Sequence, residues 1–312
     1  MLVERERVTV LLPVYNGMPH LPIAVMSILK QTFKEFKMLI ISDGSTDGTI
    51  EYLKGLDDPR LHIIDQEHRG LGATLNHGLE LCNTEYLARM DADDYSMPER
   101  LEKQVEFMDA NPDVCVVGCQ IEYFSKDPNI SGFPTQVHTR HEDIKNCLMR
   151  PEHALTHPTL LFRTSVIKDI GGYRFTGIGE DWDLFLRIGQ AGRLANLPEC
   201  LHKMRVHAES VTWKYSGINQ RYNLYSVDCA KRRSIGLPEQ TLEEFTLRYG
   251  RRPLLRKTID YLSGKSLFSY RKGIIAYLEG RRLVGVLRLI FAGLVDPIRI
   301  IRRGRRFVRL KW

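Results

Sequence analysis

The segment Asp91-Ala92-Asp93 carries the side chains of this sequence best suited to chemistry. Side chains at positions i and i+2 of an extended segment lie on the same face, so Asp91 and Asp93 would present two carboxylates together. Two adjacent carboxylates repel each other unless one is protonated or a cation lies between them. Hard oxygen ligands favour Mg²⁺ or Mn²⁺, which keep coordination positions open for phosphate oxygens. The segment therefore predicts a divalent-metal site, although a single Asp-x-Asp is also common by chance.

Two further polar clusters follow a predicted strand, as residues 91–94 do. Residues 13–16 (Pro-Val-Tyr-Asn), 42–47 (Ser-Asp-Gly-Ser-Thr-Asp) and 91–94 (Asp-Ala-Asp-Asp) each follow directly on a predicted strand. Any one of them could be an ordinary turn or helix cap, because Asp and Ser favour such positions. Ligands of open α/β sheets bind beyond the carboxyl ends of the strands. Three polar clusters at one edge of a sheet therefore favour a binding site over three unrelated turns.

The elements that position these clusters alternate along the first half of the chain. Short apolar runs predict strands, and the amphipathic stretches between them predict helices. The expected strands are Val8–Val14, 37–41, 61–64, 86–90 and Val114–Phe124, and the expected helices are Leu21–Leu29, 46–56, Leu71–Leu81, 98–108 and Glu180–Ala191. Such alternation is typical of an α/β fold with a mostly parallel sheet covered on both faces.

Charge divides the chain into two regions. Residues 251–312 contain 17 Lys and Arg against 3 Asp and Glu, whereas residues 1–250 contain 28 against 35. From about residue 216 the pattern is predominantly helical and increasingly basic. We expect a catalytic α/β domain over residues 1–215 and a helical, Arg-rich region over residues 216–312 with a separate role.

The order of the motifs resembles glycosyltransferase family 2 over roughly residues 7–210. The matching segments are residues 10–16, 43–47, 69–76, 90–94 and 180–184. The resemblance implies the GT-A fold, in which a Rossmann-like nucleotide-binding half and a mostly parallel mixed sheet are flanked by helices. It also implies an inverting enzyme that transfers a sugar from a nucleotide-diphosphate sugar to a hydroxyl of a glycan or lipid-linked glycan.

The resemblance implies that eight residues bind the donor nucleotide. These are Pro13, Tyr15, Asn16, Asp43, Arg69, Asn76, Asp91 and Ala92. Asp43 would accept a hydrogen bond from a uracil-type ring, which favours a UDP-sugar and leaves other nucleotides open. Arg69 and Asn76 lie in the segment that closes over the nucleotide in this family.

The expected cofactor is Mn²⁺ or Mg²⁺, which would neutralise the charge on the departing diphosphate. By resemblance, Asp93 is the main metal ligand and Asp91 contacts the metal or the ribose. His207 matches a histidine that often adds a further ligand, and a neutral imidazole suits Mn²⁺. A structural role for His207 remains the alternative.

The acceptor side is expected around the start of the helix at residue 180. Asp181 matches the family's catalytic base, which takes a proton from the acceptor hydroxyl. Acids in the first turn of a helix are also favoured by the macrodipole, so capping is the alternative for Asp181 and the simpler interpretation of Glu180. Trp182 could stack on a sugar, although its spacing with later apolar residues favours the core. His157 would line the acceptor side or pack inside the protein.

The last 60 residues mix arginines with apolar runs, as in residues 283–291. A helix with apolar and cationic faces can lie in the interface of an anionic membrane, which suits a lipid-linked acceptor. The alternatives are an appendage that packs on the catalytic domain or on a subunit, and, least favoured, a nucleic-acid site. We therefore expect a cytoplasmic enzyme at the cytoplasmic face of a membrane, in cell-surface polysaccharide or O-antigen synthesis.

Other function classes fit the sequence less well. A dehydrogenase would carry Gly-x-Gly-x-x-Gly after the first strand, where residues 13–17 read Pro-Val-Tyr-Asn-Gly, and no P-loop motif is present. A glycoside hydrolase also uses two carboxylates, but it needs neither a nucleotide nor a metal. A catalytically inert glycan- or nucleotide-binding module of the same fold is the remaining alternative, and it would have no need for Asp91, Asp93 and Asp181 together.

Overall fold

The computed structural model of the chain describes residues 6–129, 132–175, 179–206 and 216–297. The chain divides into two units, residues 1–121 with 137–204 and residues 122–136 with 205–312. Each unit is described by itself below.

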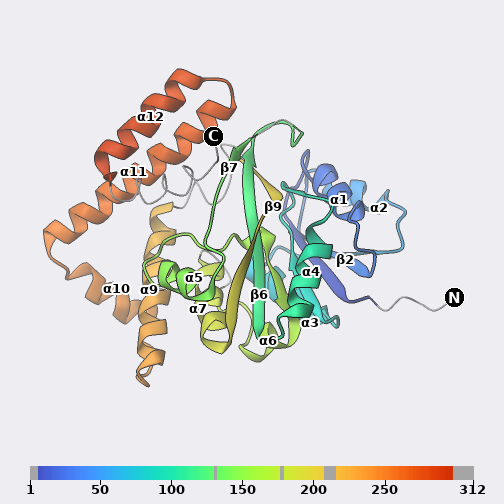
Figure 1. The fold of residues 1–312 in the computed structure, drawn as a ribbon, viewed down its shortest axis with the longest axis horizontal. Coiled ribbons are helices and arrows are strands. Elements are labelled where there is room, and N and C mark those ends of the chain that lie inside the picture. The colour runs from blue at the N-terminus through green and yellow to red at the C-terminus, as the bar shows by residue number, and fades with distance from the viewer. Residues whose placement is uncertain (1–5, 130–131, 176–178, 207–215, 298–312) are drawn as a thin grey trace. The chain divides into compact units, whose positions relative to one another are not determined.

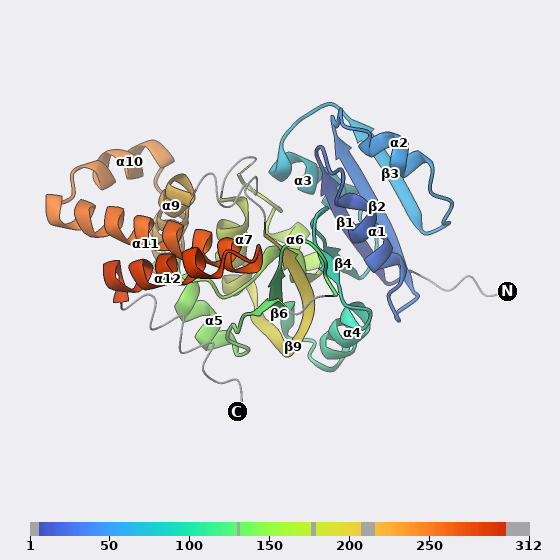
Figure 2. The same cartoon turned by 90° about the horizontal axis from the view of Figure 1, so that it is seen from above.

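Four parallel strands form the first half of the sheet (Figure 1, with all four labelled in Figure 2), in the order β3 (Leu61–Gln66), β2 (Phe36–Asp43), β1 (Val8–Val14) and β4 (Tyr86–Arg89). Val10 of β1 pairs with Met38 of β2 and with Ala88 of β4. Because the strands are parallel, their carboxyl ends meet at one edge. The polar clusters after β1, β2 and β4 therefore share that edge, as the sequence predicts.

The sheet continues beyond β4 with antiparallel strands. The order is β8 (Leu161–Arg163), β6 (Val114–Phe124), β9 (Arg193–Arg205) and β5 (Tyr95–Ser96), and β7 (Phe133–Pro134) pairs with the end of β6. The sheet is thus mixed, with its parallel half at the predicted nucleotide side. Short strands such as β5 and β7 lack a periodicity that sequence analysis could use.

Helices cover both faces of the parallel half because β1 is apolar on both faces. Val10 and Leu12 pack into one buried cluster with apolar side chains of α1 (Leu21–Leu29) and α4 (Arg100–Ala110). Leu11 points to the other face, where Gly78 of α3 (Leu71–Leu81) lies against its side chain. Burial of strand residues on both faces is typical of parallel sheets.

The remaining helices of the first unit are short, apart from α7. They are α2 (Thr49–Lys54), α5 (His141–Leu148), α6 (Thr164–Asp169), α7 (Glu180–Ala191) and a 3-10 turn, η1 (His157–Thr159). α2 begins later than the predicted residue 46, because Gly48 adopts a left-handed conformation (φ 86°) and Asp47 accepts hydrogen bonds from the backbone and hydroxyl of Thr49.

The described part of the second unit is predominantly helical, as predicted. It contains α9 (Ser216–Ser234), α10 (Leu242–Gly250), α11 (Leu254–Leu278) and α12 (Arg282–Val295). Both Figure 1 and Figure 2 show α11 and α12 side by side as a helical hairpin. No helix in the described residues has the length and apolar character needed to cross a membrane.

Candidate active site

The loops after β1 and β2 are joined by Asn16. Its backbone N–H donates to Ser45 Oγ (3.0 Å), and its Oδ1 accepts from the backbone N–H of Thr46 (2.8 Å). The left-handed backbone of Asn16 (φ 53°) is one that asparagine tolerates better than most residues. Tyr15 beside it is 55% exposed, and its ring centroid lies 4.5 Å from that of His68. Two predicted donor residues therefore lie at the expected edge, with an exposed aromatic ring.

Asp43 ends β2 and organises the loop that follows β3. Its Oδ1 accepts from Gln66 Nε2 (2.7 Å) and from the backbone N–H of Arg69 (2.9 Å), and its Oδ2 accepts from the N–H of Gly70 (2.9 Å). Burial raises the pKa of this carboxyl, but these hydrogen bonds outweigh burial and hold its pKa below the usual range. Asp43 is therefore charged, and it holds the exposed Arg69 at this edge of the sheet.

Pro13, the remaining predicted donor residue at the end of β1, is buried in that strand opposite Ile41. It lies two residues before the exposed Tyr15, so it supports the loop that presents the ring.

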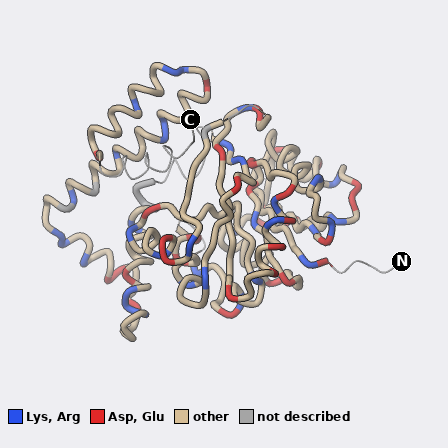
Figure 3. Tube along the Cα trace, in the orientation of Figure 1, with Lys and Arg blue, Asp and Glu red and all other residues tan. Residues whose placement is uncertain are grey.

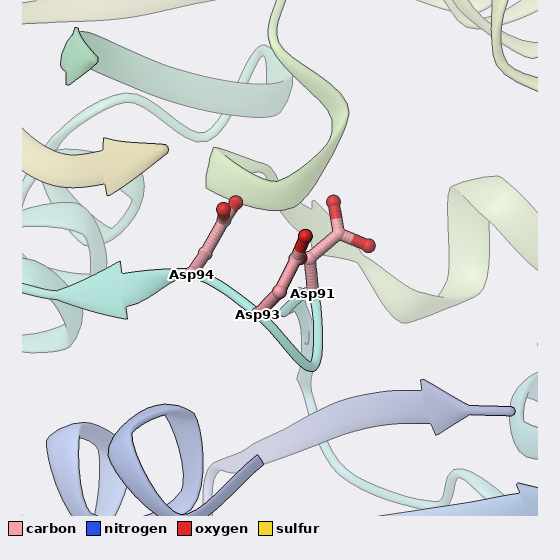
Figure 4. Close-up of side chains that lie close together, drawn as sticks. All are labelled: Asp91, Asp93 and Asp94. Atoms are coloured by element: carbon pink, nitrogen blue, oxygen red, sulfur yellow. The ribbon is translucent and has the colours of Figure 1, made fainter. Parts of the chain in front are cut away.

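Three carboxylates lie together in the loop between β4 and β5 (Figure 4). One oxygen each from Asp91, Asp93 and Asp94 lies within 4.8 Å of the other two. Oxygens that share an octahedral cation at about 2.1 Å are separated by roughly 3–4 Å, so small side-chain movements would let a divalent cation bridge this group. Ala92 spaces the first two acids and is half-buried. The residues present fit Mn²⁺ or Mg²⁺.

A buried network holds Asp94. Its Oδ2 accepts from His202 Nε2 at 2.8 Å, and His202 Nδ1 lies 3.3 Å from Nη1 of Arg100. Burial lowers the pKa of His202 well below its usual value, so the imidazole is neutral. Burial also lowers the pKa of Arg100 to about 10, which leaves the guanidinium charged at neutral pH. Asp94 therefore differs from its partly exposed neighbours, because it is tied into the protein interior.

Arg89, at the end of β4, is a functional residue that the sequence analysis missed. It is 3% exposed, and its guanidinium contacts the carboxylate of Asp91. Its Nε–H has no hydrogen-bond partner among the residues that the structure describes. Burial lowers the pKa of Arg89, but the charge of Asp91 outweighs burial and holds its pKa above the usual value. A permanent cation thus lies among the acids of this site.

Glu180 and Asp181 begin α7, directly after Gly179 in a left-handed conformation (φ 84°). Burial raises the pKa of Glu180 to about 8, and the charges of Asp181 and Asp91 add to this effect. Burial likewise raises the pKa of Asp181, against the backbone N–H of Trp182 and the charge of Arg89, which lower it. A carboxylate with a raised pKa is a better proton acceptor than an ordinary surface carboxylate.

The loop before α7 is fixed by Asn76. The amide of Asn76 donates to the backbone carbonyl of Tyr173 and accepts from its N–H, both at 2.8 Å. Gly172 allows this contact, since it has a φ of 59° and an added Cβ would lie 2.6 Å from Asn76 Oδ1. Arg187 of α7 also donates to the carbonyl of Gly172. The structure thus shows Asn76 clamping the Tyr173 loop, whereas its predicted contact with the nucleotide stays a prediction.

The predicted acceptor residues His157 and Trp182 are both buried. His157 Nε2 shares a 2.8 Å hydrogen bond with the hydroxyl of Tyr173, and burial lowers the pKa of this imidazole well below its usual value. The indole N–H of Trp182 donates to the carbonyl of Leu148, and the side chain is 7% exposed. Trp182 therefore packs in the core, and does not offer its ring to a sugar. His207, the predicted further metal ligand, lies outside the described residues.

Comparison with known proteins decides the family. The family described as Glycosyl transferase family 2 matches residues 9–171. The O-antigen biosynthesis glycosyltransferase WbnJ of Escherichia coli is 32% identical over 213 residues, which cover 66% of this chain and 82% of that protein. The chain belongs to glycosyltransferase family 2.

One further relative and one solved structure extend this finding. The UDP-Gal:alpha-D-GlcNAc-diphosphoundecaprenol beta-1,3-galactosyltransferase of Escherichia coli is 30% identical over 65% of this chain and 76% of its own length. The mannosyltransferase PcManGT of Pyrobaculum calidifontis, solved with GDP-Man and Mn²⁺, has a TM-score of 0.57 at 17% identity and covers 99% of this chain and 88% of its own. That likeness shows the GT-A fold. This family 2 chain is therefore a glycosyltransferase with the fold that its sequence predicts.

Proposed function

We propose that this glycosyltransferase is an inverting, divalent-metal-dependent enzyme that uses a UDP-sugar as donor. The observation that carries the proposal is the group of three carboxylates after β4, with Glu180 and Asp181 close enough for the charge of Asp91 to raise the pKa of Glu180. A metal-diphosphate site and a carboxylate base are the two parts that single-displacement transfer requires.

In the proposed reaction Asp181 accepts the proton of the acceptor hydroxyl. The oxygen then forms a bond to the anomeric carbon, and the bond from that carbon to the diphosphate breaks on the opposite side with its electron pair going to the phosphate oxygen. A divalent cation held by Asp93 and Asp91 would stabilise the charge on the departing diphosphate. Tyr15, Asn16 and Asp43 would hold the nucleotide, and the guanidinium of Arg89, which contacts Asp91, would add a positive charge beside the diphosphate.

The acceptor is proposed to be a lipid-linked glycan at the cytoplasmic face of a membrane, in cell-surface polysaccharide or O-antigen synthesis. The names of two relatives support this assignment, since one acts in O-antigen biosynthesis and the other on a diphosphoundecaprenol acceptor. Residues 1–215 would carry the transfer, and the basic residues 216–312 would place the enzyme at the membrane.

Release of nucleoside diphosphate tests the proposal. The purified chain is incubated with UDP-Gal, UDP-Glc, UDP-GlcNAc or GDP-Man and a diphosphate-linked GlcNAc acceptor, with Mn²⁺ or with EDTA. We expect Mn²⁺-dependent release of UDP, inhibited by EDTA. Release of GDP alone would change the donor and keep the reaction class, whereas no release from any donor together with binding of the glycan would indicate an inert binding module.

A further inference from the structure

In the α11–α12 hairpin, α12 carries most of its large apolar side chains on the outside. Seven of the 14 residues of α12 are large apolar side chains that are at least 42% exposed. These residues are Leu283, Val284, Val286, Leu287, Ile290, Phe291 and Leu294. α11 adds exposed residues such as Leu255, Tyr261 and Phe268. An exposed apolar surface of this extent, gathered on one helical hairpin, marks an interaction site.

The contact between the two helices is made by small residues. Gly273 and Gly285 approach so closely that a Cβ on Gly285 would lie 2.9 Å from the carbonyl oxygen of Gly273. Ser266 and Ser269 donate their hydroxyls to backbone carbonyls of α12, at 2.8 and 2.9 Å. Ala292 is fully buried beside them. Small residues at a helix contact, with hydroxyl hydrogen bonds across it, are typical of helices that pack in lipid.

α1 gives a contrasting example within the same chain. This helix is also rich in apolar residues, but it buries Leu21, Val25 and Ile28 against the sheet. In α12, by contrast, the buried residues are Gly285 and Ala292, which are both small. α12 therefore places small residues inside and large apolar residues outside, which is the reverse of a helix that faces water.

The hairpin is also basic, with two cations among its exposed apolar side chains. The hairpin, residues 254–297, contains eight Lys and Arg and three Asp and Glu. Lys265 and Arg288 line a groove of about 420 Å³ together with Phe268, Leu287 and Phe291. In Figure 3 the two helices are mostly tan with separate blue segments. Long cationic side chains beside apolar ones can reach lipid phosphates while the apolar groups enter the acyl region.

We propose that the α11–α12 hairpin docks in the interface of an anionic lipid bilayer, with the exposed face of α12 entering the lipid. This inference deepens the proposed placement at a membrane and rests on that part of the proposed function. A second copy of the chain is a poorer occupant. A symmetric interface would bring Lys265 and Arg288 of one copy towards the same cations of the other, with few carboxylates to compensate.

Flotation of the full chain with lipid vesicles tests the proposal. Vesicles of phosphatidylcholine containing phosphatidylglycerol are compared with vesicles of phosphatidylcholine alone. We expect binding to the anionic vesicles that weakens with salt, because surface charge contributes to it. The variant Leu287→Glu/Phe291→Glu should bind at least about tenfold more weakly, since both side chains are exposed and each would carry a charge into the lipid.

The control variant is Ile235→Glu/Leu247→Glu. These side chains are 70% and 60% exposed and lie outside the hairpin, so the change in net charge is the same. If both variants lose vesicle binding equally, the loss reflects the added negative charge alone, and the proposal that the α12 face enters the lipid is wrong. Absence of vesicle binding by the wild-type chain would also overturn it, as would a lipid-free dimer that only Leu287→Glu/Phe291→Glu dissociates.

UDP binding in the absence of lipid separates this inference from glycosyl transfer. We expect wild-type UDP affinity in Leu287→Glu/Phe291→Glu, because the substituted residues belong to α12 and not to the carboxylate site. Loss of vesicle binding with intact UDP binding would show that the substitutions affect the membrane contact and not the nucleotide site.

Discussion

The carboxylate site and the α11–α12 hairpin are both unusual for a folded protein, but in opposite ways. The site gathers charged groups where water is scarce, with Arg89 3% exposed and the pKa of Glu180 raised to about 8 by burial. The hairpin exposes large apolar side chains such as Leu283 and Leu294, at 74% and 78%. Each arrangement is unfavourable in the isolated protein and becomes favourable with a partner of suitable chemistry.

Each of the two regions requires a partner of different chemistry. Clustered carboxylates are stabilised by a cation, and a raised pKa makes a carboxyl competent to accept a proton. An apolar surface with a cationic border is stabilised by an anionic lipid surface. The largest effects on catalysis should therefore come from single carboxylates of the first unit, and substitutions in the hairpin should leave the chemistry unchanged.

Asp181→Asn gives the largest expected effect. The amide cannot accept the proton of the acceptor, so transfer should fall by about a hundred- to ten-thousandfold while UDP affinity stays near that of the wild type. The measurement is UDP release with acceptor, together with UDP titration.

Asp143→Asn is the matched control, because Asp143 occupies the first turn of α5 as Asp181 occupies that of α7. Both substitutions remove a favourable helix-dipole interaction. Near wild-type transfer by Asp181→Asn would assign that residue to capping and place the base elsewhere.

Asn76→Ala should reduce transfer by about tenfold, because it leaves the backbone N–H and carbonyl of Tyr173 without their partner. If Asn76 acts only on this loop, UDP affinity is retained. A matching loss of UDP affinity would support the contact with the nucleotide predicted from the sequence. Asn83→Ala serves as control, since Asn83 is exposed and bonds to Lys37.

The pH dependence of transfer should report the two half-buried acids at the start of α7. Activity requires a deprotonated Asp181, and burial raises the pKa of this carboxyl, so the rate should rise with pH over a range above that of an ordinary aspartate. Glu180→Gln removes one of two repelling carboxyls, so the rising limb should move to lower pH. An unchanged limb in this variant would show that Glu180 does not influence the base.

Thermal stability gives the smallest expected effect. The pKa of Glu180 rises from 4.5 to about 8 on folding, so its contribution to stability is complete below about pH 4.5 and is lost as the pH rises through 8. Glu180→Gln should therefore raise Tm by roughly 2–4 °C at high pH and leave it unchanged near pH 4.5. Glu142→Gln, in the exposed first turn of α5, is the control for replacement of a first-turn glutamate.

The sequence predicted the elements whose periodicity is strong. β1, α1 and α3 coincide with the expected ranges, because a buried strand and an apolar helix face leave clear patterns. The antiparallel half was less accessible, since β5 has only two residues and pairs with β9. Their pairing depends on contacts distant in the chain.

The site was predictable where its residues are neighbours in sequence. The closeness of Asp91 and Asp93 was predicted, but it arises in a turn at residues 92–93 and not in the extended segment that the prediction assumed. The position of Asp43 follows from the end of a parallel strand. Arg89 had an available signal, because it lies two residues before Asp91 on the same expected face. No sequence signal pointed to His202, since its hydrogen-bond partner Asp94 lies 108 residues away in the chain.

Isothermal titration of UDP into the wild-type chain and Asp93→Asn, with Mn²⁺ and then with EDTA, tests the central claim most directly. Asp113→Asn is the control, because Asp113 is exposed and paired with Arg193. We predict UDP binding that requires Mn²⁺ in the wild type and in Asp113→Asn and is lost in Asp93→Asn. Equal, Mn²⁺-dependent binding by Asp93→Asn would contradict the account of the carboxylate site.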